Sequence, residues 1–119
     1  MMIIIMIIIT INFELDFVEV PLNQTLTCPS DMAAVFRCRY EPQPNVIIWR
    51  VDGEQFRSSS QSGIESTYIS HDNGSKTEIL TIPNNPLYNG TQVECVAYPS
   101  VEGTPVAILI ILTGGQVTN

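Results

Sequence analysis

Residues 34–53 read AVFRCRYEPQPNVIIWRVDG, and this stretch decides the fold. Over residues 34–40, apolar side chains alternate with others, which places Phe36 and Cys38 on one face and two arginines on the opposite face. Alternation with a period of two is typical of a β-strand with one buried face. After two prolines the chain resumes as an apolar run, residues 46–51, which ends at Asp-Gly, a strong hairpin signal. The stretch therefore predicts two strands and a tight turn.

Similar patterns on both sides of this stretch predict further short strands. Residues 13–20 alternate but change phase by one residue after Phe17, so we expect a bulge or kink there, and the following Pro21 suits an edge strand. Residues 23–31 are polar and read as a turn-rich connection. The other expected strands span residues 55–57, 67–70, 77–82, 92–97 and 106–113. With no convincing helical period, the chain is predicted to be all-β, with seven to nine strands in a sandwich or small barrel.

Length and charge limit the classes of protein and partner. The 119 residues fit one ordinary domain. Twelve acidic residues against five basic ones give a formal net charge of −7. Because phosphate binding needs clustered Lys and Arg, this balance argues against DNA or RNA as a partner.

The sequence lacks the common signatures of catalysis and metal binding. It contains no Gly-x-Ser-x-Gly elbow and no glycine-rich phosphate loop, and its single histidine, His71, lies in a polar run that we interpret as an exposed turn. The three cysteines form no CxxC pair, and no acidic calcium loop is present. We therefore expect a protein that is not an enzyme, with no metal, no cofactor and no small-molecule substrate.

Four residues of the expected strands form a recognisable constellation. Cys38, Trp49, Leu80 and Cys95 lie in the segments FRCRY, VIIWRVDG, TEILTI and NGTQVECVA. This pattern resembles the immunoglobulin superfamily. The resemblance implies an immunoglobulin-like Greek-key β-sandwich of antiparallel strands, in which a disulfide between Cys38 and Cys95 joins the two sheets and Trp49 packs against it.

Some positions depart from the family pattern. Val93 stands where the family commonly has the tyrosine of the tyrosine corner, and Asn89 cannot make the aspartate–arginine ion pair that is usual in variable-type domains. The interval from Trp49 to Leu80 is long enough for two further strands, which indicates an intermediate or degenerate variable-type module. No Phe-Gly-x-Gly follows the last expected strand, so a rearranging antigen receptor is disfavoured.

The remaining cysteine and three sequons bear on the cellular compartment. Asn23, Asn73 and Asn89 each begin an Asn-x-Ser/Thr sequon in an expected loop, and we predict glycosylation there. Together with the implied cysteine pair, the sequons favour an oxidising secretory route and an extracellular, secreted or cell-surface location. Cys28 has no implied partner, and two interpretations stay open, an interchain disulfide or a free thiol.

The ends of the chain are interpreted separately from the domain, which we place at residues 12–114 with a tail at 115–119. Residues 1–11 read MMIIIMIIITI, which is too short to span a bilayer. This segment has the size of a signal-peptide core but lacks a basic start and a small-residue cleavage site. The alternatives are a translated simple repeat at the edge of an incomplete gene model and an extended first strand.

Two functions are consistent with these expectations. The first is an extracellular protein-binding module in cell adhesion or recognition, with Arg50, Glu94 and Val96 as candidates on an exposed sheet face. The alternative is a structural spacer from a tandem array without its own ligand. The partner is accordingly a protein ligand or a neighbouring immunoglobulin-like domain, and a membrane is reached only through an anchor outside this sequence. The apolar run 107–112 fits either an interdomain contact or burial within the sandwich.

Overall fold

The computed structural model describes residues 16–57, 63–99 and 102–113. The predictions for residues 1–11, for residues 13–15 of the first strand and for the tail at 115–119 fall outside these ranges. The described residues are almost entirely β, which confirms the predicted fold class. Their strands are β1 (Asp16–Glu19), β2 (Gln24–Cys28), β3 (Ala34–Glu41), β4 (Val46–Val51), β5 (Glu54–Gln55), β6 (Glu65–Ser70), β7 (Lys76–Ile82), β8 (Gln92–Tyr98), β9 (Glu102–Gly103) and β10 (Ala107–Thr113), and a 3-10 helix, η1, spans Pro86–Tyr88.

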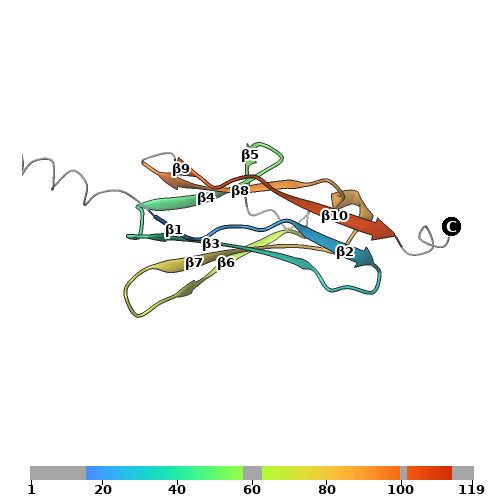
Figure 1. Cartoon of the computed structure of the whole chain (residues 1–119), viewed down its shortest axis with the longest axis horizontal. Coiled ribbons are helices and arrows are strands. Elements are labelled where there is room, and N and C mark those ends of the chain that lie inside the picture. Colours follow the sequence, from blue (N-terminus) through green and yellow to red (C-terminus); the bar gives the residue numbers. More distant parts are fainter. Residues whose placement is uncertain (1–15, 58–62, 100–101, 114–119) are drawn as a thin grey trace, which may run out of the picture.

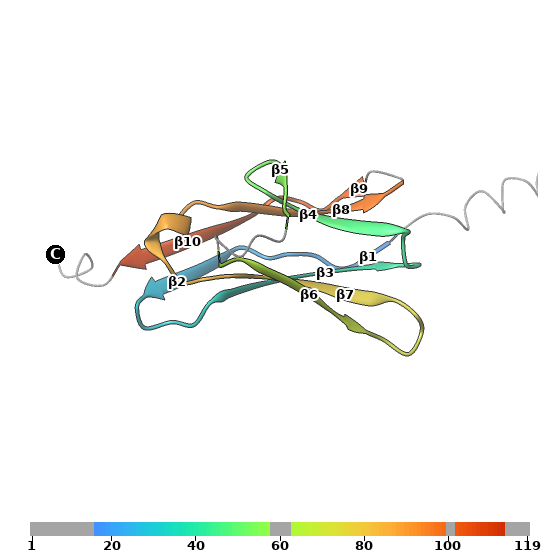
Figure 2. The ribbon, with the colours of Figure 1, turned by 180° about the vertical axis from the view of Figure 1, so that it is seen from behind.

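The strands form two facing sheets (Figure 1 and, from behind, Figure 2). One sheet has the order β1-β3-β7-β6, and the other has the order β2-β10-β8-β4-β5, with β9 paired to β8. Every ladder is antiparallel except that of β2 and β10, which run parallel. The parallel pair departs from the expected antiparallel arrangement because the chain changes sheets after Pro21: β1 pairs with β3, whereas β2 joins β10 in the opposite sheet.

Local sequence signals explain several element boundaries. The pairing of β1 with β3 shifts register between Phe17 and Glu19, where the change of phase predicts a bulge. Asp52 and Gly53 have φ values of 53° and 83°, and positive φ at both positions is the requirement of a type I′ hairpin turn between β4 and β5.

The interpretation of residues 23–31 as a connection is wrong for residues 24–28, which form β2. This strand is difficult to recognise because its outward residues are threonines. Only Leu26 and Cys28 of β2 pack against the core, and both are only half-buried. Pairing with β10, rather than its own hydropathy, makes this segment a strand.

The core lies between the sheets around a Cys38–Cys95 disulfide, the bridge that the family resemblance implies. Trp49 is directly opposite Cys95 in the β4–β8 ladder and is 3% exposed. The buried Tyr40 hydroxyl shares its single proton between the carbonyl oxygens of Cys95 (3.0 Å) and Glu102 (2.8 Å). Burial, reinforced by the nearby charge of Glu102, raises the pKa of Tyr40 to about 12. The other buried apolar side chains of this core cluster are Ala34, Phe36, Ile64, Leu80, Ile82, Val93, Ala97, Ala107, Leu109 and Ile111.

We expect removal of the bridge by Cys38→Ala with Cys95→Ala to lower the free energy of unfolding by about 2–5 kcal/mol, the usual loss for a native disulfide in a small secreted domain. The bridge joins cysteines 57 residues apart, so its loss frees the unfolded chain as well as loosening the core. Urea unfolding under oxidising conditions measures the change. Cys28→Ala, which removes a half-buried thiol outside the bridge, is the control, and equal unfolding midpoints for the two proteins would contradict the assignment.

Candidate edge groove

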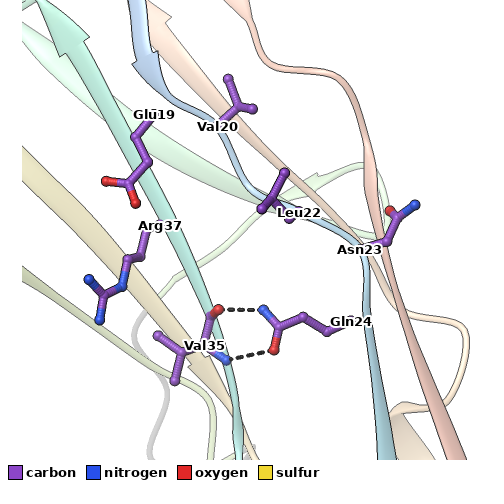
Figure 3. A pocket seen from close by; sticks show the side chains of 7 residues that line it. All are labelled: Glu19, Val20, Leu22, Asn23, Gln24, Val35 and Arg37. Atoms are coloured by element: carbon purple, nitrogen blue, oxygen red, sulfur yellow. Dashed lines mark hydrogen bonds between the residues drawn. The ribbon is translucent and has the colours of Figure 1, made fainter.

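A groove of about 300 Å³ lies where the chain passes from one sheet to the other (Figure 3). The β1–β2 connection forms one wall and β3 the other. Its lining contains one carboxylate and one guanidinium but no Ser, Cys, His or Lys. The lining residues are Glu19, Val20, Leu22, Asn23, Gln24, Val35 and Arg37.

The groove exists because β1 accompanies β3 over only part of its length. The β1–β3 ladder ends at the pair Glu19–Arg39, and β1 is the outer strand of its sheet. The chain then leaves for the other sheet, so among the described residues no strand pairs with residues 35–37 of β3 on this side. An open strand edge presents backbone groups to any chain that can pair with them.

The Gln24 side chain closes part of this edge. Its carboxamide oxygen accepts from the Val35 N–H at 3.2 Å, and its nitrogen donates to the Val35 carbonyl (Figure 3). A neighbouring strand residue would make the same two bonds in an antiparallel ladder. Gln24 therefore replaces one missing residue pair of the ladder and ties β2 to β3 across the gap between the sheets.

The rest of the groove combines exposed apolar side chains with one carboxylate, Glu19, and one guanidinium, Arg37. Leu22 is 70% exposed and Val35 is 39% exposed, although both are large apolar side chains. Arg37 makes no ion pair within the described part of the chain, where the salt bridges are Arg39–Glu41 and Arg50–Glu94. The arrangement offers apolar contact and a guanidinium that is free to pair with a carboxylate of a partner.

Sequence reasoning missed this groove. Pro21 after a short strand indicates that the strand ends, but nothing in the sequence says that the chain then joins the opposite sheet. The exposure of Leu22 follows from that change of sheet. The signal that could have indicated the groove is the change of phase at Phe17 followed by Pro21. Together they mark the place where the chain leaves its first sheet, and not only an edge strand.

The predicted face residues are only partly accessible. Arg50 Nη1 and Glu94 Oε1 lie 3.8 Å apart on the outer face of the larger sheet, beside a hollow of about 40 Å³ that Val106 also lines. Val96 is 2% exposed, so its assignment to an exposed face is wrong. The reason is β9, which the sequence did not predict: Gly103 pairs with Val96 and lies against its side chain.

The sequon residues Asn23 and Asn89 are exposed and are held by β10. The Asn23 Oδ1 accepts from the Ile108 N–H at 2.8 Å, and the Asn89 Oδ1 accepts from the Ile111 N–H at 2.8 Å. Each asparagine thus extends a ladder of β10 just before β2 or β8 begins. These bonds use the oxygen and not Nδ2, the atom that carries a glycan. Glycosylation at both positions stays a prediction.

Asn73, the third sequon residue, belongs to a polar cluster on β3 and the β6–β7 turn. Its Nδ2 donates to Glu41 Oε2 at 2.9 Å, and Arg39 Nη2 donates to the same oxygen at 2.7 Å. The hydrogen bond from Asn73, followed by the charge and hydrogen bond of Arg39, lowers the pKa of Glu41 below its ordinary value. His71 in the same turn is half-buried instead of fully exposed, since its Nε2 lies 2.6 Å from Thr77 Oγ1.

Cys28 is a half-buried thiol at the end of β2. Its Sγ lies 3.9 Å from the Asn84 carbonyl oxygen and packs against the core. The other two cysteines of the chain are bridged to each other, so Cys28 has no disulfide partner within this chain. The choice between an interchain disulfide and a free thiol stays open.

Residues 16–57, 63–99 and 102–113 hold neither a metal-binding cluster nor a membrane-spanning helix. No three His, Cys, Asp or Glu side chains there come together as a metal ion would require. None of the helical structure in these ranges is long and apolar enough to cross a bilayer.

Comparison with known proteins identifies the fold of the chain. No protein-family model and no curated protein matches the sequence. Among solved structures, the chain is similar to the N-terminal Ig1-2 module of the Drosophila receptor protein tyrosine phosphatase DLAR, with TM-score 0.61 and 23% identity over 86% of this chain and 50% of that one. The chain thus spans about half the length of the DLAR module.

Two further solved structures give the same result. Down Syndrome Cell Adhesion Molecule (N-terminal eight Ig domains) matches with TM-score 0.63 and 19% identity over 82% of this chain and 12% of that one. Domain I81 of titin matches with TM-score 0.59 and 21% identity over 82% of this chain and 96% of that one. The described sandwich therefore has the immunoglobulin fold.

We expect Asn73→Ala to raise the pKa of Glu41 toward its ordinary value of 4.5, because Asn73 donates the hydrogen bond that lowers it most. A pKa that folding lowers adds stability above the ordinary value, and this contribution is lost as the pH falls through the folded value. Carbon-13 NMR titration of the Glu41 carboxyl group measures the midpoint. Asn45→Ala, at an exposed asparagine of the β3–β4 loop, is the control. An unchanged Glu41 midpoint in Asn73→Ala would contradict the cluster.

Proposed function

We propose that this chain is a non-enzymatic, extracellular immunoglobulin-like module that binds another protein through the edge groove. The observation that carries the proposal is the exposure of Leu22 and Val35 beside the unpaired guanidinium of Arg37. Apolar side chains with a nearby arginine are characteristic of the central part of protein–protein interfaces. A side chain or an extended segment of a partner fits a groove of this size better than a flat surface does.

Two further observations support the proposed extracellular location and the proposed role in adhesion or recognition. The Cys38–Cys95 bridge suits an oxidising compartment, where structural disulfides persist. The solved structures that resemble this chain include modules of a receptor phosphatase and of a cell adhesion molecule. Cell adhesion or recognition is the role that we propose on these grounds.

The alternative of a structural spacer rests on a different part of the molecule. Met32 and Leu87 are 87% and 86% exposed, and they lie in the β2–β3 connection and in η1. Both elements lie at the end of the sandwich where β10 finishes (Figure 1). Exposed apolar residues at the end of a module suit contact with a neighbouring domain, and a domain of titin has the same fold.

Binding through the groove is tested with fluorescent tetramers of the full chain on cells of its source organism. We expect the unaltered chain to bind, and Leu22→Asp and Arg37→Glu each to weaken binding about tenfold or more, as loss of a central contact residue does. Thr67→Asp, on the exposed far edge strand β6 of the same sheet, is the matched control.

Equal binding by the groove variants and the control would contradict the groove as the site. If the unaltered chain binds no cell, while Met32→Asp or Leu87→Asp disrupts association with a neighbouring domain, the spacer function is supported instead.

A further inference from the structure

The outer face of β10 carries a row of exposed apolar side chains. Ala107, Leu109 and Ile111 point inward and are buried, so the apolar run contributes to the core with one half of its residues only. The other half faces solvent. Val106 is 48%, Ile108 38%, Ile110 38% and Leu112 45% exposed. These four residues form what we call the β10 row, and an uncovered row of this kind favours aggregation on a soluble protein.

Asn23 is fixed beside this row. Its Oδ1 accepts from the Ile108 N–H at 2.8 Å, which holds the carboxamide against the backbone of Ile108. Leu22 and Gln24 point toward β3, whereas the side chain of Asn23, which also lines the groove, points toward β10 (Figure 3). Thr25, the hydroxyl residue of the sequon, is exposed and pairs with Ile110 in the β2–β10 ladder. The sequon therefore runs along the edge of the row.

We infer that an oligosaccharide on Asn23 covers the β10 row, with its first sugars packed on Ile108 and Ile110. The inference rests on the extracellular location that we propose above, since the glycan is added in the secretory pathway. In that step Nδ2 bonds to C1 of the oligosaccharide, the C1–O bond to its lipid diphosphate donor breaks, and Nδ2 loses one of its two protons. Oδ1 takes no part, so the modified side chain retains its hydrogen bond to Ile108.

The chemistry of the sugar suits this position. A pyranose ring presents C–H groups on its faces and hydroxyl groups around its edge, so it can lie on apolar side chains and stay hydrated outside. The hydrogen bond to Ile108 fixes where the first ring begins. Because the same bond directs the Asn23 carboxamide toward β10, the glycan extends over β10 and leaves the side chains of Leu22 and Arg37, on the β3 side of the groove, accessible.

The test compares the secreted full chain with Thr25→Ala, both labelled with carbon-13 at the isoleucine methyl groups. Thr25→Ala removes the sequon but keeps Asn23 and its bond to Ile108. Mass spectrometry of glycopeptides gives the occupancy of Asn23, Asn73 and Asn89. A soluble paramagnetic probe then broadens each methyl signal according to its exposure. Ile69, 49% exposed on β6 in the other sheet, is the internal control.

We expect Asn23 to be modified, and the Ile108 and Ile110 methyl signals to lose most of the broadening that they show in Thr25→Ala, with Ile69 unchanged. Equal broadening of Ile108 and Ile110 in both proteins would overturn the inference. An unmodified Asn23 in protein that carries glycans at Asn73 or Asn89 would overturn it while leaving the extracellular location intact. Secreted protein with no glycan at any sequon would overturn the inference. It would also remove the sequons as support for an extracellular location. Failure of the groove variants to affect binding bears on the proposed function alone.

Discussion

The parallel pairing of β2 with β10 is the constraint on which both candidate surfaces, the edge groove and the β10 row, depend. Residues 24–28 lie alongside residues 109–113, so the chain must leave β3 after Pro21 and cross to the opposite sheet. The crossing leaves part of the β3 edge without a strand and exposes Leu22 beside it. It also brings Asn23 against β10. One change of sheet thus produces the groove beside β3 and places the sequon residue Asn23 against β10.

Side-chain amides compensate for the strand pairs that this topology omits. Gln24 bonds both backbone groups of Val35, and Asn23 and Asn89 each accept from an N–H of β10. A buried or edge backbone group without a partner costs free energy, and a carboxamide offers the same donor and acceptor as a peptide unit. These side-chain bonds act only at the edges and ends of the strands. The disulfide and Trp49 stabilise the interior between the sheets.

The sequence was informative where hydropathy alone decides the structure. The β4 strand has the predicted bounds, because prolines precede it and the Asp52-Gly53 turn follows it. The faces of β3 are as predicted, because its alternation is strong and its four inward residues are all buried. Prediction failed where pairing decides: β2 has little apolar pattern, and β9 is only two residues long yet buries Val96. The groove could not be predicted, since it depends on which sheet residues 24–28 join and not on their own composition.

Amide hydrogen exchange at Val35 tests the central claim most directly, namely that Gln24 occupies an edge which the change of sheet leaves open. In the unaltered chain the Val35 amide is bonded to Gln24 and should be protected, although Val35 lies on an exposed edge. In Gln24→Ala it should exchange much faster, while the Phe36 amide, which by strand alternation faces β7, should keep its protection. Equal protection of Val35 in both proteins would show that another group covers this edge and would contradict the account.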